Sequence, residues 1–106
     1  MRSDWGSLRW FANRELTGTD KLTIGRTVIL PGQRNPRHSH PNCTEVLYLL
    51  AGTLEHDING EKFIMHAGDS ITIPASTPHF AVNIGQVDAD MIVVFDSGDR
   101  AFQLEP

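Results

Sequence analysis

The chain has 106 residues, 40% of them hydrophobic, with a formal net charge of −4. This length supports one compact domain over residues 1–106, and the acidic balance without a basic run argues against a nucleic-acid partner. No apolar run could span a membrane, and the N-terminus lacks the apolar core and cleavage site of a signal peptide. The only cysteine, Cys43, excludes an intrachain disulfide, so we expect a cytoplasmic protein.

The first 21 residues carry an unusual number of large apolar side chains for a chain terminus, namely Trp5, Leu8, Trp10 and Phe11. Apolar surface of this size needs cover. We therefore expect residues 1–21 to pack on the rest of the domain, as a strand that closes it, or to lie against a second subunit.

Strand patterns fill most of the remaining chain. Residues 22–30 alternate with period two and end at Pro31-Gly32, and Asn59-Gly60 is a strong signal for a β-hairpin. The apolar run 46–50 is typical of a buried strand. Further short strands are expected at 53–58, 62–65, 70–73, 80–84 and 89–95. Regular spacing of short strands with almost no helix predicts an antiparallel all-β sandwich or barrel.

Four side chains of metal-binding type stand near the ends of these strands. His38 and His40 lie on one face of an extended segment, because side chains in a strand repeat every two residues. Pro41-Asn42 then turns the chain so that Glu45 can point back toward them. Glu45 leads into an apolar strand, where a carboxylate is expensive to bury unless a cation accompanies it. His79 follows a turn stiffened by two prolines, and the four residues together predict a first-row transition-metal site.

The spacing of these residues resembles the two motifs of the cupin superfamily. The first motif is a glycine, five residues, H-x-H, three or four residues, glutamate, six residues and glycine, and it fits Gly32, His38, His40, Glu45 and Gly52. The second is a glycine, five residues, P-x-G, two residues, histidine, three residues and asparagine, and it fits Gly68, Pro74, His79 and Asn83. Ser76 replaces the second glycine of that motif, which touches no ligand position.

The resemblance, to small single-domain cupins, implies a double-stranded β-helix, or jelly-roll barrel, with the motifs in a barrel over about residues 22–96. It also implies one divalent transition metal ion per chain, with Fe or Mn first and Ni or Zn as further options. Small cupins are commonly dimers, so we expect a homodimer to which residues 1–21 contribute. Dioxygenases, decarboxylases, isomerases and lyases all use this scaffold.

Three side chains are candidates for the walls of a ligand pocket. His56 shares strand parity with Leu54 and Ile58, and Arg26 shares parity with the apolar residues of its own strand. An inward Arg26 could hold a substrate carboxylate, but Gly25 could mark a bulge that turns it outward. Phe80 belongs to the pocket if the other two face solvent. Elsewhere, we expect Cys43 at the rim as a non-ligand, Tyr48 behind the sheet, Met65 in the core and His66 in solvent.

These features favour a metal-dependent enzyme that acts on a small oxygen-rich or anionic molecule. Dioxygenase chemistry is favoured over isomerase, lyase or decarboxylase chemistry, and the sequence identifies no catalytic acid or base. The alternative is a non-catalytic module in which the metal holds a sugar or organic acid, or only braces the barrel.

Overall fold

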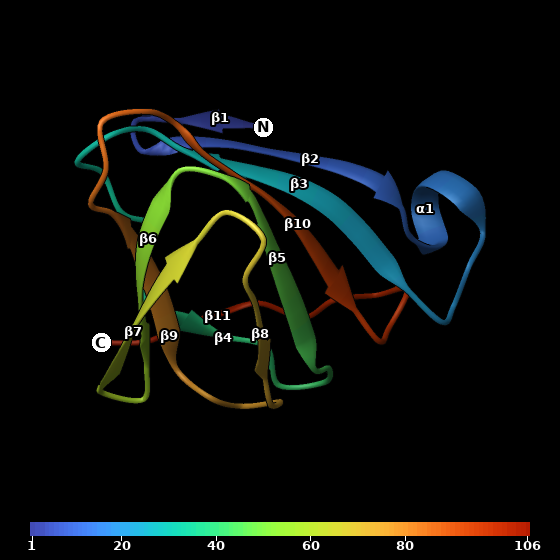
Figure 1. Ribbon diagram of the computed structural model, residues 1–106. Helices are drawn as coiled ribbons and strands as arrows, with labels where there is room; N and C mark the ends of the chain where they lie inside the picture. Colours follow the sequence, from blue (N-terminus) through green and yellow to red (C-terminus); the bar gives the residue numbers. More distant parts are fainter.

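A computed structural model describes all 106 residues and consists almost entirely of antiparallel strands in two facing sheets (Figure 1). The six-stranded sheet has the order β1 (Arg2–Ser3), β2 (Gly6–Ala12), β3 (Thr23–Ile29), β10 (Ala89–Phe95), β5 (Glu45–Ala51) and β8 (Ser70–Ile73). The five-stranded sheet has the order β11 (Gln103–Leu104), β4 (His38–Ser39), β9 (His79–Asn83), β6 (Thr53–Ile58) and β7 (Glu61–His66). The all-β jelly-roll expectation is thereby confirmed.

The local signals in the sequence account for most of these strands. The expected strands at 53–58, 70–73 and 89–95 match β6, β8 and β10 residue for residue. Asn59 and Gly60 have φ of 51° and 91°, which is the geometry that a tight hairpin between β6 and β7 requires. The one helix, α1 (Arg14–Thr17), is a single turn that the strand patterns did not predict. No helix is long and apolar enough to cross a bilayer.

The core lies between the two sheets and is built from alternate residues of the facing strands. Leu47 and Leu49 of β5 meet Leu54 of β6 and Met91 of β10 in one buried cluster. Met65 is buried and His66 exposed, as expected. Cys43 differs from the expectation, because it lies in the core at 3% exposure rather than at a rim. Burial raises the pKa of its thiol.

The inward faces of two strands differ from those that the apolar pattern suggested. On β3 the buried residues are Thr23, Gly25, Thr27 and Ile29. The apolar residues of β3 that alternate with these four therefore face outward. Gly25 occupies an inward position at which only a residue without a Cβ leaves room for the ring of Trp10. β5 is buried on one face only, since Val46, Tyr48 and Leu50 are 41%, 44% and 47% exposed. Apolar content alone therefore misassigned the inward face of β3 and overstated the burial of β5.

Both chain termini extend the barrel. β2 pairs with β3 along its length, so the N-terminal segment closes the sheet as a strand, the first of the two expected arrangements. At the other end β11 pairs with β4, which brings residues 103–104 against the segment that carries His38. The ordered barrel thus continues past residue 96.

Candidate metal centre

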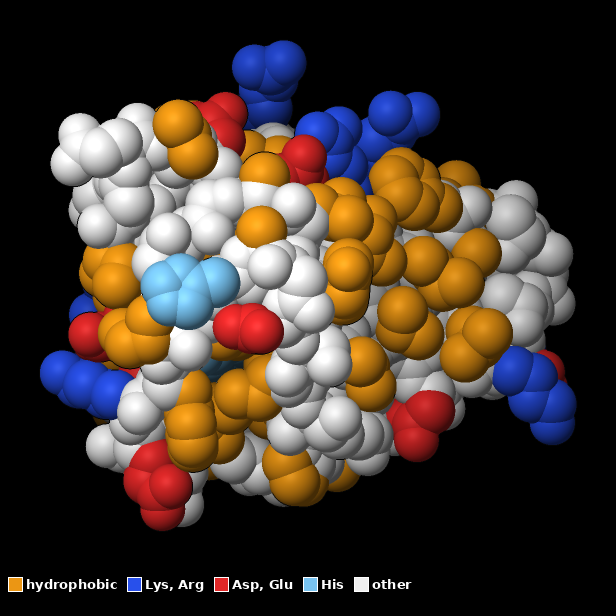
Figure 2. Space-filling model, viewed as in Figure 1, with side chains coloured by type: hydrophobic (Ala, Val, Ile, Leu, Met, Phe, Trp, Pro, Cys, Tyr) orange, Lys and Arg blue, Asp and Glu red, His pale blue; other side chains and the backbone are white.

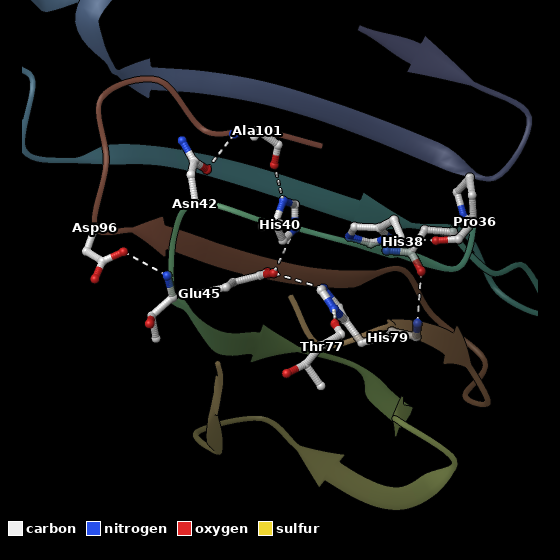
Figure 3. A network of polar contacts seen from close by, with 12 residues as sticks. Pro36, His38, His40, Asn42, Glu45, Thr77, His79, Asp96 and Ala101 are labelled. Carbon is white, nitrogen blue, oxygen red and sulfur yellow. Dashed lines mark hydrogen bonds and ion pairs between the residues drawn. The ribbon is translucent and has the colours of Figure 1, made fainter. Parts of the chain in front are cut away.

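The four predicted metal ligands come together inside the barrel. His38 lies on β4, Glu45 and His79 open β5 and β9, and His40 follows β4 (Figure 3). All four are buried, and one ligand atom from each lies within 4.8 Å of the others. Antiparallel pairing of β4 with β9 sets His38 opposite His79, which explains how residues distant in sequence meet here.

A backbone carbonyl fixes the orientation of each imidazole ring. The Nδ1 atoms of His38, His40 and His79 lie 2.6 Å, 2.8 Å and 2.8 Å from the carbonyl oxygens of Pro36, Ala101 and Thr77 respectively. A carbonyl only accepts, so each Nδ1 must donate its hydrogen. A neutral ring then has an unprotonated Nε2, which is the form that binds a metal, and a backbone partner of this kind is the usual support of a metal-bound histidine.

The Nε2 atoms converge on the carboxylate of Glu45. Oε1 of Glu45 lies 3.0 Å from Nε2 of His79 and 3.3 Å from Nε2 of His40. Lone pairs on a carboxylate and on two neutral imidazoles repel one another at these distances unless protons or a cation lie between them. The donor set, three imidazoles and one carboxylate, suits a divalent first-row ion.

Burial and neighbouring charges shift the acidities in the direction that a metal site needs. Burial raises the pKa of Glu45, but hydrogen bonds that His40 and His79 donate whenever Nε2 carries a proton outweigh it and hold the pKa well below the usual range. Burial, reinforced by His79, lowers the pKa of His38 to about 4. Near neutral pH Glu45 is therefore ionised and His38 neutral, so neither has to lose a proton before it binds an ion.

The turn that precedes His79 contacts the first motif directly. Ser76 has φ of 62°, a left-handed conformation that favours glycine, and its N–H donates to the His40 carbonyl at 3.0 Å. Serine therefore adopts the backbone conformation that the missing motif glycine would take. The replacement leaves the path of this turn intact.

The C-terminal segment also supports the site, and sequence reasoning did not anticipate it. Asn42 accepts from the Ala101 N–H at 2.9 Å and donates to the Asp99 carbonyl at 2.8 Å, which holds the Ala101 carbonyl against His40. The ring of Phe102 stacks on His38 with centroids 4.9 Å apart. The alternation of Phe102, Gln103 and Leu104 was the available signal for a strand here.

A cavity of about 450 Å³ opens beside the four residues, and 11 of its 20 lining residues are hydrophobic. Trp5, Leu8 and Trp10 of the N-terminal segment form part of the wall, together with Met91 and Val93 of β10. The volume falls within the range of small-molecule binding sites. The four candidate ligands thus border a mainly apolar chamber.

Of the three pocket candidates, only His56 lines this cavity. It is 2% exposed, its ring centroid lies 5.8 Å from that of His79, and neither ring nitrogen has a hydrogen-bond partner. Burial lowers its pKa to about 4.

The other two candidates lie outside the cavity. Arg26 projects from the outer face of β3 and donates to both carboxylate oxygens of Asp90, at 2.8 Å and 2.6 Å. Phe80 packs beneath the guanidinium of Arg34, whose Cζ lies 4.1 Å from the centroid of the Phe80 ring. Arg26 takes the outward of its two expected placements, because its parity follows the outward apolar residues of β3. Phe80 is displaced because its neighbours His79 and Ala81 take the inward positions of β9.

The geometry of the four candidate ligands agrees with the protein family that the sequence matches. The family model described as the cupin domain matches residues 25–95. The chain belongs to this family. Within the cupins it is 32% identical over 91 residues to polyketide synthase CurC of Streptomyces cyaneus, covering 86% of this chain and 59% of that protein. It is 34% identical over 98 residues to oxalate oxidase GF-2.8 of Triticum aestivum, covering 85% of this chain and 44% of that protein. The match therefore covers less than two thirds of the length of each of these relatives.

Solved structures show the same fold. An oxalate oxidase in complex with the substrate analogue glycolate superposes with a TM-score of 0.87 at 27% identity, covering 95% of this chain and 55% of the other. A mutant of the oxalate decarboxylase OxdC of Bacillus subtilis superposes with a TM-score of 0.90 at 21% identity, covering 98% of this chain and 29% of the other. The second likeness concerns the fold alone.

Proposed function

We propose that this cupin is a metal-dependent enzyme that acts on a small organic acid or a similar oxygen-rich molecule. His38, His40, Glu45 and His79 would hold one divalent ion per chain, with iron or manganese favoured over nickel or zinc. The observation that carries the proposal is the set of three Nδ1 hydrogen bonds to carbonyls, which leaves the Nε2 atoms free around a buried carboxylate.

The ion would supply Lewis acidity, since three neutral imidazoles and one carboxylate leave it a residual positive charge that attracts anionic oxygen. The chain supplies the surroundings. The mainly apolar walls lower the local dielectric constant, which strengthens the attraction between a cation and a carboxylate. A small acid is favoured for this reason, and relatives named as oxalate oxidases support the same class.

His56 is the side chain of the chamber best placed to contact a substrate oxygen. A buried imidazole without hydrogen bonds costs about 1–3 kcal/mol, so a bound molecule that supplies a partner recovers that free energy. The low pKa keeps the ring neutral near pH 7. A neutral ring offers one N–H donor and one acceptor to the substrate.

The reaction class is testable with metal-loaded protein. Dioxygenase chemistry, which we favour over isomerase, lyase or decarboxylase chemistry, predicts oxygen consumption on addition of an organic acid to protein loaded anaerobically with iron or manganese. Product formation without oxygen uptake would favour the other three classes. Metal-dependent binding of the acid without turnover would instead establish the non-catalytic module, and the His79→Ala variant is the control for each assay.

The outer face of the six-stranded sheet supports the expectation of a homodimer. Figure 2 shows hydrophobic side chains gathered on one side of the molecule. Val46, Tyr48 and Leu50 of β5 are exposed on the outer face of this sheet. Contiguous apolar surface of this kind is typical of protein interfaces. Light scattering coupled to size exclusion should give a dimer for the wild type and a monomer for Tyr48→Lys. A monomeric wild type at micromolar concentration would contradict this part of the proposal.

A further inference from the structure

Arg100 is a cationic side chain of the chamber without a polar partner. It is the only Lys or Arg among the lining residues, and its Nε is buried with no hydrogen bond. Burial lowers the pKa of this guanidinium, against the opposing influence of Glu45, yet an arginine side chain stays charged at any physiological pH. The protein therefore keeps an unpaired positive charge beside its metal centre.

The nearby acidic groups are engaged elsewhere. Asp99 forms an ion pair with Arg14 on the surface, and Asp96 accepts from the Thr44 N–H at 2.7 Å. Glu45, the only carboxylate that lines the chamber, faces His40 and His79. No carboxylate of the chain is thus within ion-pairing distance of Arg100.

Three aromatic rings hold the guanidinium in place. Its Cζ lies 4.8 Å from the ring centroid of Trp10, and 5.2 Å from those of Phe95 and Phe102. Cation–π contacts stabilise the charge and fix its position, but they leave the N–H donors in the plane of the group without acceptors. An oriented guanidinium of this kind matches the two oxygens of a carboxylate.

The same rings connect Arg100 to the metal centre. The centroid of the His40 ring lies 4.8 Å from that of Phe95 and 6.1 Å from that of Phe102. Ala101, the residue after Arg100, accepts the Nδ1 hydrogen of His40. Arg100 and the candidate ligands therefore belong to one packed unit and border one chamber.

We propose that Arg100 is a specificity-determining residue that binds a second acidic group of the substrate, while the first binds the metal. The inference rests on the proposed function, and it narrows the substrate to acids with two carboxylates, or a carboxylate and an equivalent anion, joined by a mainly apolar segment. The mainly apolar lining of the chamber fits such a molecule. A bound dianion would neutralise the excess positive charge of the chamber.

Binding to the Co²⁺-loaded protein tests this assignment without any turnover. The visible absorption spectrum of Co²⁺ changes when a carboxylate binds the metal. The protein is titrated with the linear diacids from oxalate to suberate and, for comparison, with monoacids of equal chain length. We expect one or more diacids to bind the wild type about 10- to 100-fold more tightly than the matching monoacid, which is the size of a charge-assisted bidentate contact.

Three variants isolate the role of Arg100. Arg100→Met should abolish the advantage of the diacid over the matching monoacid, and Arg100→Lys should keep part of that advantage through its charge. Arg34→Met is the matched control, because Arg34 also lies over an aromatic ring but outside the chamber. It should behave as the wild type.

The outcomes separate this inference from the function on which it rests. If no acid perturbs the Co²⁺ spectrum of the wild type, the proposed metal-dependent function fails. If monoacids bind the metal but no diacid exceeds its monoacid, or if Arg100→Met and Arg100→Lys keep the full advantage, the assignment of Arg100 is overturned.

Discussion

Nε2 of His79 lies 3.0 Å from Oε1 of Glu45 although the Nδ1 of the same ring already donates to the Thr77 carbonyl. A neutral His79 therefore presents a lone pair to a carboxylate oxygen, and His40 does the same at 3.3 Å. A divalent cation bound between these atoms removes this repulsion. Glu45 is thus the residue at which the metal-free and metal-bound states differ most.

Glu45→Gln should move stability and metal affinity in opposite directions. The amide can donate to the Nε2 atoms that the carboxylate repels, so the metal-free variant should be at least as stable as the wild type. Loss of the anionic ligand should weaken metal binding by about tenfold or more. Chemical denaturation in a chelator and calorimetric titration with the metal measure the two effects. A variant that is less stable and binds metal equally well would contradict the repulsion argument.

His79→Ala should lower metal occupancy sharply and leave the β-rich fold intact, because the apolar core of the barrel does not depend on this ring. Metal content after equilibration with one equivalent of ion gives the result, and circular dichroism verifies the fold. His66→Ala is the control, since His66 is exposed and is not one of the four clustered candidate ligands. Equal metal content in both variants would refute the assignment of His79.

The stability of the metal-free protein should fall as the pH drops from about 6.5 toward 4. Burial lowers the pKa of His38 and of His56 to about 4, whereas an unfolded histidine titrates near 6.5. In this window the unfolded chain binds protons that the folded chain does not. Each residue then removes about 1.4 kcal/mol per pH unit.

Urea denaturation in chelator at several pH values between 7 and 4.5 measures this slope. His56→Leu removes one of the two groups and should reduce the histidine contribution by about half. Stability that stays constant between pH 7 and pH 5 in the wild type would contradict the neutral, buried state of both rings.

Position 76 should tolerate glycine better than any branched residue. Ser76 holds a left-handed φ of 62°, so Ser76→Gly should keep or raise the free energy of unfolding, by up to about 1 kcal/mol. Ser76→Val should lower it by about 1–2 kcal/mol, because β-branched side chains resist this conformation. Thermal denaturation compares the two, and equal midpoints would show that the turn adopts another backbone conformation in solution.

Sequence patterns predicted the strands far better than they predicted which face of a strand is buried. The hairpin at Asn59-Gly60 and the strands of 70–73 and 89–95 follow from local signals, which act over a few residues. Facing depends on what packs from elsewhere. Gly25 occupies an inward position where only a residue without a Cβ leaves room for Trp10, and no local rule could reveal that contact. Arg26 points outward together with the apolar residues of its parity, which the pattern had assigned to the core.

The metal-centre residues could be predicted, but the surroundings that complete the site could not. The spacing of the two motifs was sufficient to predict that His38, His40, Glu45 and His79 lie together, as they do in the structure. The Ala101 carbonyl and the Phe102 ring come from a C-terminal segment without a motif, and they reach the site only because β11 pairs with β4. His56 was predictable because its parity coincides with that of the buried Leu54.

Anomalous diffraction from crystals of the protein loaded with manganese tests the central claim most directly. The account predicts one anomalous peak per chain, bonded to an Nε2 atom from each of His38, His40 and His79 and to the carboxylate of Glu45. No peak among these four residues at saturating metal, or a peak bonded through Nδ1 atoms, would contradict it.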